Sequence, residues 1–453
     1  MNEKKATLTI AVLSSFLTPF MLSSLNISLP TIAKDFNINA IMMGWIATSY
    51  LLATSIFLVP MGKLADIKGK KKIFLYGIAI FTLSSFLCGI AHSAILMIIF
   101  RIVQGLGSAL IFSTSIAIIT SVFPQSERGK VLGITVSSVY SGLSLGPFLG
   151  GIITEYLSWR IIFVMMVPVG LIIMYIVKKY LSSEWVDAEN EKIDIIGSTL
   201  YIISISLLMI GLINFTNLYG ILIFLVGVVF ITIFIFYELK IDYPIVNIKL
   251  FKQNKVFTYS NLAALANYSS TFAVTFLLSI YLQNIKDFTP KSTGVLLIIL
   301  PVMMAIFSPI AGRLSDRIEP RILSSSGMLI IAVSFIPLSF LDKDSNMLMI
   351  LIPLFVQGIG FALFSSPNAN AIMSSVEKRY YGVASAIMAT MRMVGQSTSL
   401  AISMLLFSLF FGNEKLSKVD KLLFIDAIRY GFIIFSVISF LGMFASLKRG
   451  NIR

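Results

Sequence analysis

Cysteine and histidine each occur once in this chain, as Cys88 and His92. One thiol cannot form a disulfide within the chain, and one imidazole cannot build a histidine-based metal cluster. Charged residues are also scarce, at 12% of 453 residues, whereas hydrophobic residues make up 57% and the mean hydropathy is +0.92. A soluble domain cannot bury that much apolar surface. We therefore expect an all-α integral membrane protein, because lipid requires backbone polar groups to be satisfied within helices.

Apolar runs divide the chain into fourteen expected transmembrane helices. Stretches such as 7–32 and 221–237 supply the roughly 20 apolar residues that a helix needs to cross the bilayer core. The first run is too long for a signal-peptide core, and no small-residue cleavage site follows it, so we expect a retained first helix.

The net charge of +14 does not form a basic face or tail. Basic residues instead occupy short loops on alternate sides of the expected spans, which is the positive-inside pattern. This pattern predicts a multi-pass protein of the cell (plasma) membrane with both termini in the cytoplasm. It argues against a nucleic-acid partner.

An internal repeat divides the chain into two halves. The run VQGLGSAL at 103–110 recurs as VQGIGFAL at 356–363, and GKLADIKG at 62–69 is echoed by GRLSDRIE at 312–319. Parallel repeats of this kind occur in transporters that rock two helical bundles around a central site. We predict a six-helix bundle over 1–180, two inserted helices with cytoplasmic linkers over 181–256, and a second six-helix bundle over 257–453.

Two loops in corresponding places are candidate gates. In the first, glycines permit a tight turn and an acid can cap a helix or pair with a basic residue; a turn with solubilising lysines is the alternative. The candidate gating residues of the two loops are Gly62, Asp66, Gly69, Lys70, Lys71, Gly312, Asp316 and Arg317.

Two arginines lie inside expected spans. An unpaired guanidinium in hydrocarbon costs at least about 2.5 to 3.5 kcal/mol, so Arg101 must face the protein interior or water. Gln104 follows it on the same helix. Arg392 is the second buried cation and has Gln396 one turn away. These residues either act in transport or tie helices together.

A glycine-rich segment, GLSLGPFLGG at 142–151, lies in the fifth span. A proline that removes a backbone donor, flanked by glycines that let helices approach, suits a moving gate or a static crossing. The residues concerned are Gly142, Gly146, Pro147, Gly150 and Gly151. Trp159 and Arg160 then mark the outer membrane interface as an anchor pair.

Together, the loop at 62–72, the segment around Arg101 and Gln104, and the glycine-rich segment resemble the three signature motifs of the major facilitator superfamily. Fourteen spans, LNISLP at 25–30, the run WRIIF and YPIVNIKLF at 243–251 resemble its fourteen-spanner drug:proton antiporter branch. The resemblance implies two six-helix bundles with two extra central helices, alternating access, and a proton gradient as the energy source with no cofactor.

One departure concerns coupling. Members of that branch commonly carry an acid in the first span, and here the corresponding place, near Met21, has none. Glu155 is the best remaining candidate for the coupling carboxylate, although a solvated loop acid is the alternative. Two buried arginines without a deep acid make the expected cavity electropositive, which favours neutral or anionic substrates. Polar candidates for the cavity wall are Asn26, Tyr50, Asn267, Gln357, Asn368, Asn370 and Gln396.

The sequence therefore predicts a secondary active transporter, not an enzyme, that exports hydrophobic drugs or other small molecules in exchange for protons. We expect a monomer whose partners are small hydrophobic substrates and the lipid bilayer, with no metal site. A facilitator or exporter of a metabolite, amino acid or siderophore, or a transporter without proton coupling, remains the alternative. A transport-dead sensor on the same scaffold is a further one. A membrane enzyme would need clustered Asp, His or Glu at one membrane face, and these residues are too few.

Overall fold

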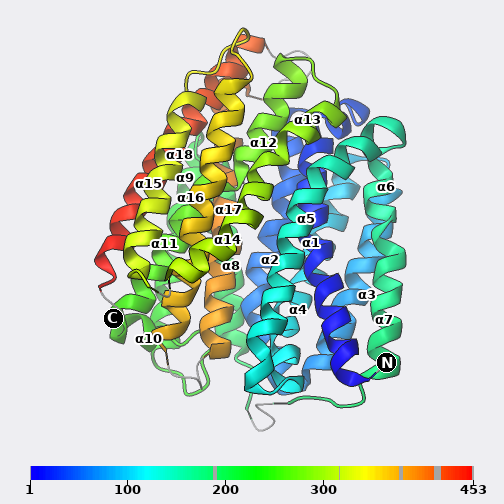
Figure 1. Cartoon of the computed structure of the whole chain (residues 1–453), viewed down its shortest axis with the longest axis vertical. Helices are drawn as coiled ribbons and strands as arrows, with labels where there is room; N and C mark the ends of the chain where they lie inside the picture. The colour runs from blue at the N-terminus through cyan, green and yellow to red at the C-terminus, as the bar shows by residue number, and fades with distance from the viewer. Residues whose placement is uncertain (1, 187–190, 316, 377–380, 413–419, 451–453) are drawn as a thin grey trace.

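The computed structural model describes residues 2–186, 191–315, 317–376, 381–412 and 420–450. Its named elements are all helices, arranged as two side-by-side groups. The blue-to-cyan helices of the first half lie on the right of Figure 1, and the yellow-to-red helices of the second half lie at its left and centre. Both termini lie in the lower part of that view, which we call the terminal end; the opposite end is the far end.

The first half runs from α1 to α7. Asn2, Asn39, Ser93 and Ser158 each cap the helix that follows by accepting a hydrogen bond from a first-turn amide. The helices are α1 (Glu3–Asp35), α2 (Ala40–Lys68), α3 (Lys70–Gly89), α4 (Ala94–Val122), α5 (Gln125–Tyr156), α6 (Trp159–Val164) and α7 (Met166–Tyr180).

Two further helices, α8 (Ile195–Ile213) and α9 (Leu218–Glu238), pair with each other. Their apolar faces meet α2 in a small cluster that contains Leu52, Val59, Tyr201 and Phe234. The hydroxyl of Tyr201 donates to the carbonyl of Ser55 at 3.1 Å. α8 also contacts α17, so the inserted pair covers the seam at which α2 meets the second half.

The second half repeats the plan with more interruptions. Its elements are α10 (Ile248–Gln253), α11 (Lys255–Thr271), α12 (Ala273–Ile280), the π-helix η1 (Tyr281–Ile285), α13 (Pro290–Leu297), α14 (Ile299–Ser315), α15 (Pro320–Leu338), α16 (Leu348–Ser374), α17 (Tyr381–Phe411) and α18 (Lys421–Lys448).

Two helix breaks have a local cause. α6 ends before Met165 and α13 before Ile298, in each case three residues ahead of a proline, Pro168 or Pro301. Proline has no amide hydrogen and its ring crowds the preceding turn, so the helix is interrupted there. With each of these broken pairs counted as one span, and with α11, α12 and η1 together as another, thirteen described spans are long and apolar enough to cross a membrane. The serine- and glycine-rich α5, with 32 residues, is the fourteenth, which agrees with the predicted all-α membrane fold.

Glycines hold one helix pair of each half at backbone contact. A Cβ at Gly107 of α4 would lie 3.0 Å from the carbonyl oxygen of Gly77 in α3, and a Cβ at Gly77 would lie 3.0 Å from that of Gly107. In the second half, a Cβ at Gly360 of α16 would lie 2.8 Å from the carbonyl oxygen of Gly327 in α15, and a Cβ at Gly327 would lie 2.5 Å from that of Gly360. Any larger residue would separate these helices.

Candidate functional site

Arg101 lies in the interior of the first half and is fully buried. Its Nε donates to the carbonyl of Ile46 in α2 at 3.1 Å, and its Nη1 donates to Oε1 of Gln104 at 2.7 Å. The guanidinium also lies over the ring of Tyr50, 4.2 Å from the centroid. Groups of α2 and α4 therefore surround this charge, as its cost in hydrocarbon requires.

The network around Arg101 leaves one nitrogen free. Nε2 of Gln104 donates a hydrogen bond to the hydroxyl of Ser85 at 2.6 Å, and the hydroxyls of Tyr50 and Ser108 form a hydrogen bond at 2.6 Å. Nη2 of Arg101 is buried and has no hydrogen-bond partner. A buried donor without a partner is costly, so this nitrogen is available to an anion or a carbonyl oxygen.

The sulfur of Met21 occupies the position next to this charge. Nη1 of Arg101 lies 3.4 Å from Met21 Sδ, and Nε2 of Gln104 lies 3.7 Å from the same atom. The place where the related branch carries an acid is therefore in direct contact with Arg101. Within the described residues, no carboxylate contacts Arg101, and its charge stays uncompensated by a counterion.

Arg392 of α17 was predicted to be buried, but it is only half-buried, among aromatic rings contributed by both halves. Its guanidinium lies 5.8 Å from the ring centroid of Phe112 in α4. Its charge acts on Tyr268 of α11, which also interacts with Tyr140 of α5. Tyr268 packs edge-on against Phe361 of α16 at 5.7 Å. We call Phe112, Tyr140, Tyr268, Phe361 and Arg392 the central aromatic cluster.

Several buried amides near this level have no partner. Neither polar atom of Asn267 in α11 or of Gln357 in α16 is hydrogen-bonded, and Oε1 of Gln396 and Nε of Arg392 in α17 are likewise unpartnered. Buried amides are almost always satisfied, so such a group points to water or a ligand. These residues were predicted as parts of the cavity, and the structure places them on three neighbouring helices of the second half.

Other predicted cavity residues lie elsewhere. Asn368 accepts a hydrogen bond at 2.9 Å from Arg449, which is buried just beyond α18, and donates to the carbonyl of Ser260. Burial lowers the pKa of Arg449 to about 10, so it stays charged at neutral pH. Asn368 therefore bridges helices, and so does Asn370, which donates to Ser315 at 3.2 Å. Asn26 is buried in α1.

The two halves meet closely at the far end. Oε2 of Glu155, at the end of α5, accepts a hydrogen bond from the backbone amide of Lys291 in α13 at 3.0 Å. Gly151 faces the backbone of α13, and Gly294 of α13 faces the carbonyl of Pro147. Gln283 of η1 donates to the carbonyl of Ile27 in α1 at 2.8 Å. Glu155 is thus exposed, and its carboxylate contacts α13 and not Arg101.

The glycine-rich segment of α5 is wedged between two helices. Gly142, Gly146 and Gly150 face α1, where Ser23 and Ser24 donate to the carbonyls of Gly142 and Gly146 at 3.3 and 2.9 Å. The opposite side of the segment, with Pro147 and Gly151, faces α13. One motif therefore packs both within its own half and across the far-end closure.

The linker between α7 and α8 holds the first predicted gating loop, a contact that was not predicted from the sequence. Glu184 accepts hydrogen bonds from the amides of Lys71 and Lys72 at 2.8 and 3.2 Å, and so caps α3. Gly69 has a φ of +104°, and its Cβ position is filled by the Glu184 side chain. Lys63 forms an ion pair with Glu191 of the same linker. The acidic residues of that linker, Glu184 and Glu191 among them, were the available signal in the sequence.

The remaining gating residues are placed as follows. Gly62 of α2 packs against Ser113 of α4, while Asp66 and Lys70 make interactions of their own at the terminal end. In the second loop, Gly312 faces Ser366 of α16, and the amide of Arg317 donates to Leu314. Asp316 lies outside the described residues.

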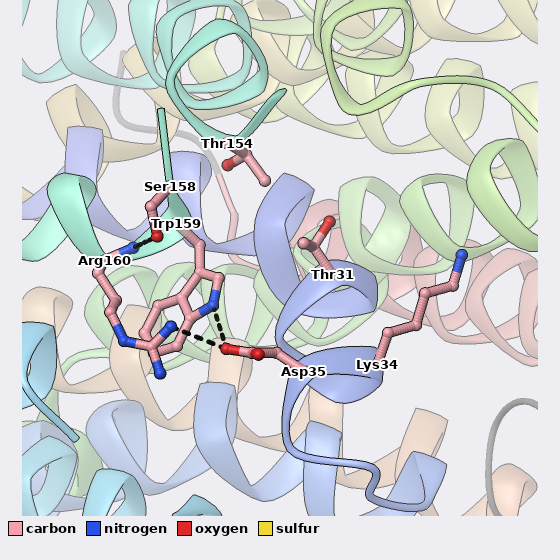
Figure 2. A pocket seen from close by; sticks show the side chains of 7 residues that line it. All are labelled: Thr31, Lys34, Asp35, Thr154, Ser158, Trp159 and Arg160. Atoms are coloured by element: carbon pink, nitrogen blue, oxygen red, sulfur yellow. Dashed lines mark hydrogen bonds and ion pairs between the residues drawn. The ribbon is translucent and has the colours of Figure 1, made fainter. Parts of the chain in front are cut away.

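A pocket of about 440 Å³ opens at the far end of α1 (Figure 2). Asp35 accepts hydrogen bonds there from Arg160 at 2.8 Å and from Nε1 of Trp159 at 3.0 Å. Trp159 is only 3% exposed, so the prediction that it anchors the chain in the membrane interface is wrong: it ties α6 to α1. The pocket lies about 20 Å along α1 from Met21 at 1.5 Å per residue.

Two helical halves, with Arg101 buried inside the first and Arg392 half-buried where the halves meet, form a polytopic helical membrane protein that is closed at one end. The family model described as Major Facilitator Superfamily matches residues 11–399 and 260–450. The chain therefore belongs to the major facilitator superfamily.

Two similar proteins have described roles. The chain is 32% identical over 419 residues, 91% of this chain and 90% of the other, to the riboflavin transporter RibZ of Clostridioides difficile (strain 630). It is 27% identical over 383 residues to the multidrug resistance protein Stp of Mycobacterium tuberculosis (strain ATCC 25618 / H37Rv), covering 83% and 71% of the two chains. These matches confirm the predicted kinship with drug-efflux members of the family.

A solved structure shares the fold. A bacterial homologue of the human lysosomal transporter Spinster, in an inward-facing and unoccupied conformation, superposes with a TM-score of 0.71 at 14% identity, over 99% of this chain and 98% of the other.

Proposed function

We propose that this protein is a proton-coupled secondary transporter that exports hydrophobic aromatic compounds of neutral or negative charge. The observation that carries the substrate class is the pair of arginines in the interior, Arg101 with a free Nη2 and Arg392 beside aromatic rings, without a carboxylate in contact with either in the described chain. Such a site attracts anions and ring systems and repels cations.

Glu155 supports a role in coupling at the far end. Its carboxylate accepts the Lys291 amide and so helps to hold the halves together. Protonation from the far side weakens this acceptor, which favours opening of that end; loss of the proton favours closure. An exporter that releases substrate at the far end and takes up a proton there would use such a residue.

The test is substrate-driven proton movement in proteoliposomes, with anionic, neutral and cationic aromatic probes. We expect flux with the first two classes and at least a tenfold loss in Glu155→Gln, because glutamine keeps the acceptor oxygen but cannot titrate. Glu127→Gln is the matched control, since Glu127 lies at the other end of α5 and pairs with Lys4. Equal flux in Glu155→Gln and wild type would remove Glu155 from the coupling step.

A second candidate is transport of one specific aromatic metabolite. The relative named as a riboflavin transporter and the central aromatic cluster both favour it. Competition separates the two functions: a multidrug exporter is inhibited by many unrelated aromatic compounds, whereas a metabolite carrier is inhibited strongly only by close analogues of one compound.

A further inference from the structure

Two carboxylates meet in a buried site at the terminal end of the inserted helices. Asp194 is the residue that caps α8, and Glu238 is the last residue of α9. Their exposed fractions are 6% and 2%. A Cβ on Gly197 would collide with Oδ2 of Asp194 and with Oε1 of Glu238 at once, so both oxygens point to the same spot over the α8 backbone.

In each carboxyl group, one oxygen accepts a hydrogen bond and the other has no donor among the described residues. Oδ1 of Asp194 accepts the amide of Gly197 at 2.8 Å and the hydroxyl of Tyr237 at 3.1 Å. Oε2 of Glu238 accepts the amide of Val246 at 2.8 Å. The other two oxygens, Oδ2 and Oε1, have no donor. They are the two that face one another.

Within the described chain, no basic side chain neutralises the two facing oxygens of the pair. Tyr237 of α9 is the other titratable group that faces the carboxyls. Lys63 of α2 pairs with Glu191, and from the loop after α9 the amide of Val246 donates to Glu238 and the backbone of Ile245 also interacts with it. Neither carboxyl forms an ion pair with any described basic residue, and two buried anions in contact repel strongly.

We infer that Asp194 and Glu238 bind one proton between them, and that this shared proton joins the terminal ends of α8 and α9. The proton comes from solvent and forms an O–H bond on the unpartnered oxygen of one carboxyl group. That O–H group donates a hydrogen bond to the unpartnered oxygen of the other carboxyl group, so both oxygens gain a partner. The pairing of two carboxyls over one proton is a known way to keep an acid protonated near neutral pH.

The shared proton is linked to the seam between the halves. Val246, whose amide holds Glu238, packs with Ile245 against the cluster that α8 and α9 form with α2. Val394 of α17 packs against the same cluster. Loss of the proton leaves two adjacent anions, which push the ends of α8 and α9 apart and loosen this packing. The site lies outside the two bundles, and its test needs no transported substrate.

The test uses purified wild type, Asp194→Asn and Glu238→Gln in lipid nanodiscs. Asparagine remains a good helix cap, and glutamine can donate to Asp194 while still accepting from Val246, so both variants should fold. We expect a protonated-carboxyl C=O infrared band in wild type near neutral pH that disappears on alkalinisation and is absent from both variants. Asp287→Asn is the control, because Asp287 is exposed and paired with Lys421.

Thermal unfolding gives a second measurement. The folded pair holds a proton that the unfolded chain releases at lower pH, so wild-type stability should fall as pH rises through release of the shared proton. This fall should be absent from both variants and present in Asp287→Asn. The inference is wrong if the infrared band survives in both variants, or if Ca²⁺ or Na⁺ raises the unfolding temperature of wild type alone, which would make the ligand a metal ion.

Discussion

The sulfur of Met21 lies 3.4 Å from Nη1 of Arg101, at the position where a carboxylate would neutralise that charge. Met21→Glu should therefore form an ion pair with Arg101. At about 4 Å and an effective dielectric constant near 20 such a pair gains about 4 kcal/mol. We expect transport of a lipophilic cation to rise about tenfold relative to a neutral probe. Fluorescent-dye efflux measures the ratio.

Met21→Gln is the matched control for this substitution, because glutamine has a similar size and no charge. An equal gain of cation transport in the two variants would show that polarity, and not charge, sets the preference, and would contradict the electropositive site.

Arg101→Gln should abolish most transport without unfolding the protein. The substitution removes the contacts to Ile46 and Tyr50 and the free Nη2, while a polar group still meets Gln104. We expect at least a tenfold lower rate of substrate counterflow, and an intermediate rate for Arg101→Lys, which keeps the charge but not the planar fork. Arg429→Gln, at the far end of α18, should leave counterflow unchanged; a matching loss there would point to a general effect of removing arginine.

Gly294→Ala should destabilise the far-end closure. The new methyl group would press on the carbonyl of Pro147 across the interface between the halves. Overpacking of this kind costs about 1 to 3 kcal/mol, enough to shift a two-state equilibrium about fivefold or more. Spin labels at the exposed Leu157 and Leu422 would report the distance between the halves. Gly431→Ala, which meets only flexible leucine side chains at 3.1 and 3.5 Å, is the control.

Glu184→Ala should lower the unfolding temperature more than Glu191→Ala. Glu184 caps two amides at the start of α3, a contact worth about 0.5 to 2 kcal/mol. Glu191 makes a partly exposed ion pair with Lys63, and such pairs contribute about 0 to 1 kcal/mol and weaken in salt. Scanning calorimetry at low and high salt measures both. A loss in Glu191→Ala as large as that in Glu184→Ala would contradict the capping role.

The sequence predicted those parts of the site whose charged groups would be too costly in free energy to expose to lipid. Arg101 had to be buried against polar groups, and its helix neighbour Gln104 is indeed its partner. Hydropathy and the repeat likewise predicted the spans and the plan of two halves. Contacts between residues far apart in sequence were not predictable, because they depend on how loops fold over helix ends. Examples are the cap that Glu184 forms on α3, the hydrogen bond from Trp159 to Asp35, and the pairing of Asp194 with Glu238. Nothing in local composition specifies those pairings.

The paired glycines of the two halves lie at different spacings along the chain. Gly77 and Gly107 are separated by 30 residues, whereas Gly327 and Gly360 are separated by 33. The contacts at the two places are nevertheless the same. The connection between α15 and α16, at 339–347, is longer than that between α3 and α4, at 90–93, so loops of different length join helices that make the same backbone contact. The close approach of the two backbones therefore depends on having glycine at both positions and not on the length of chain between them.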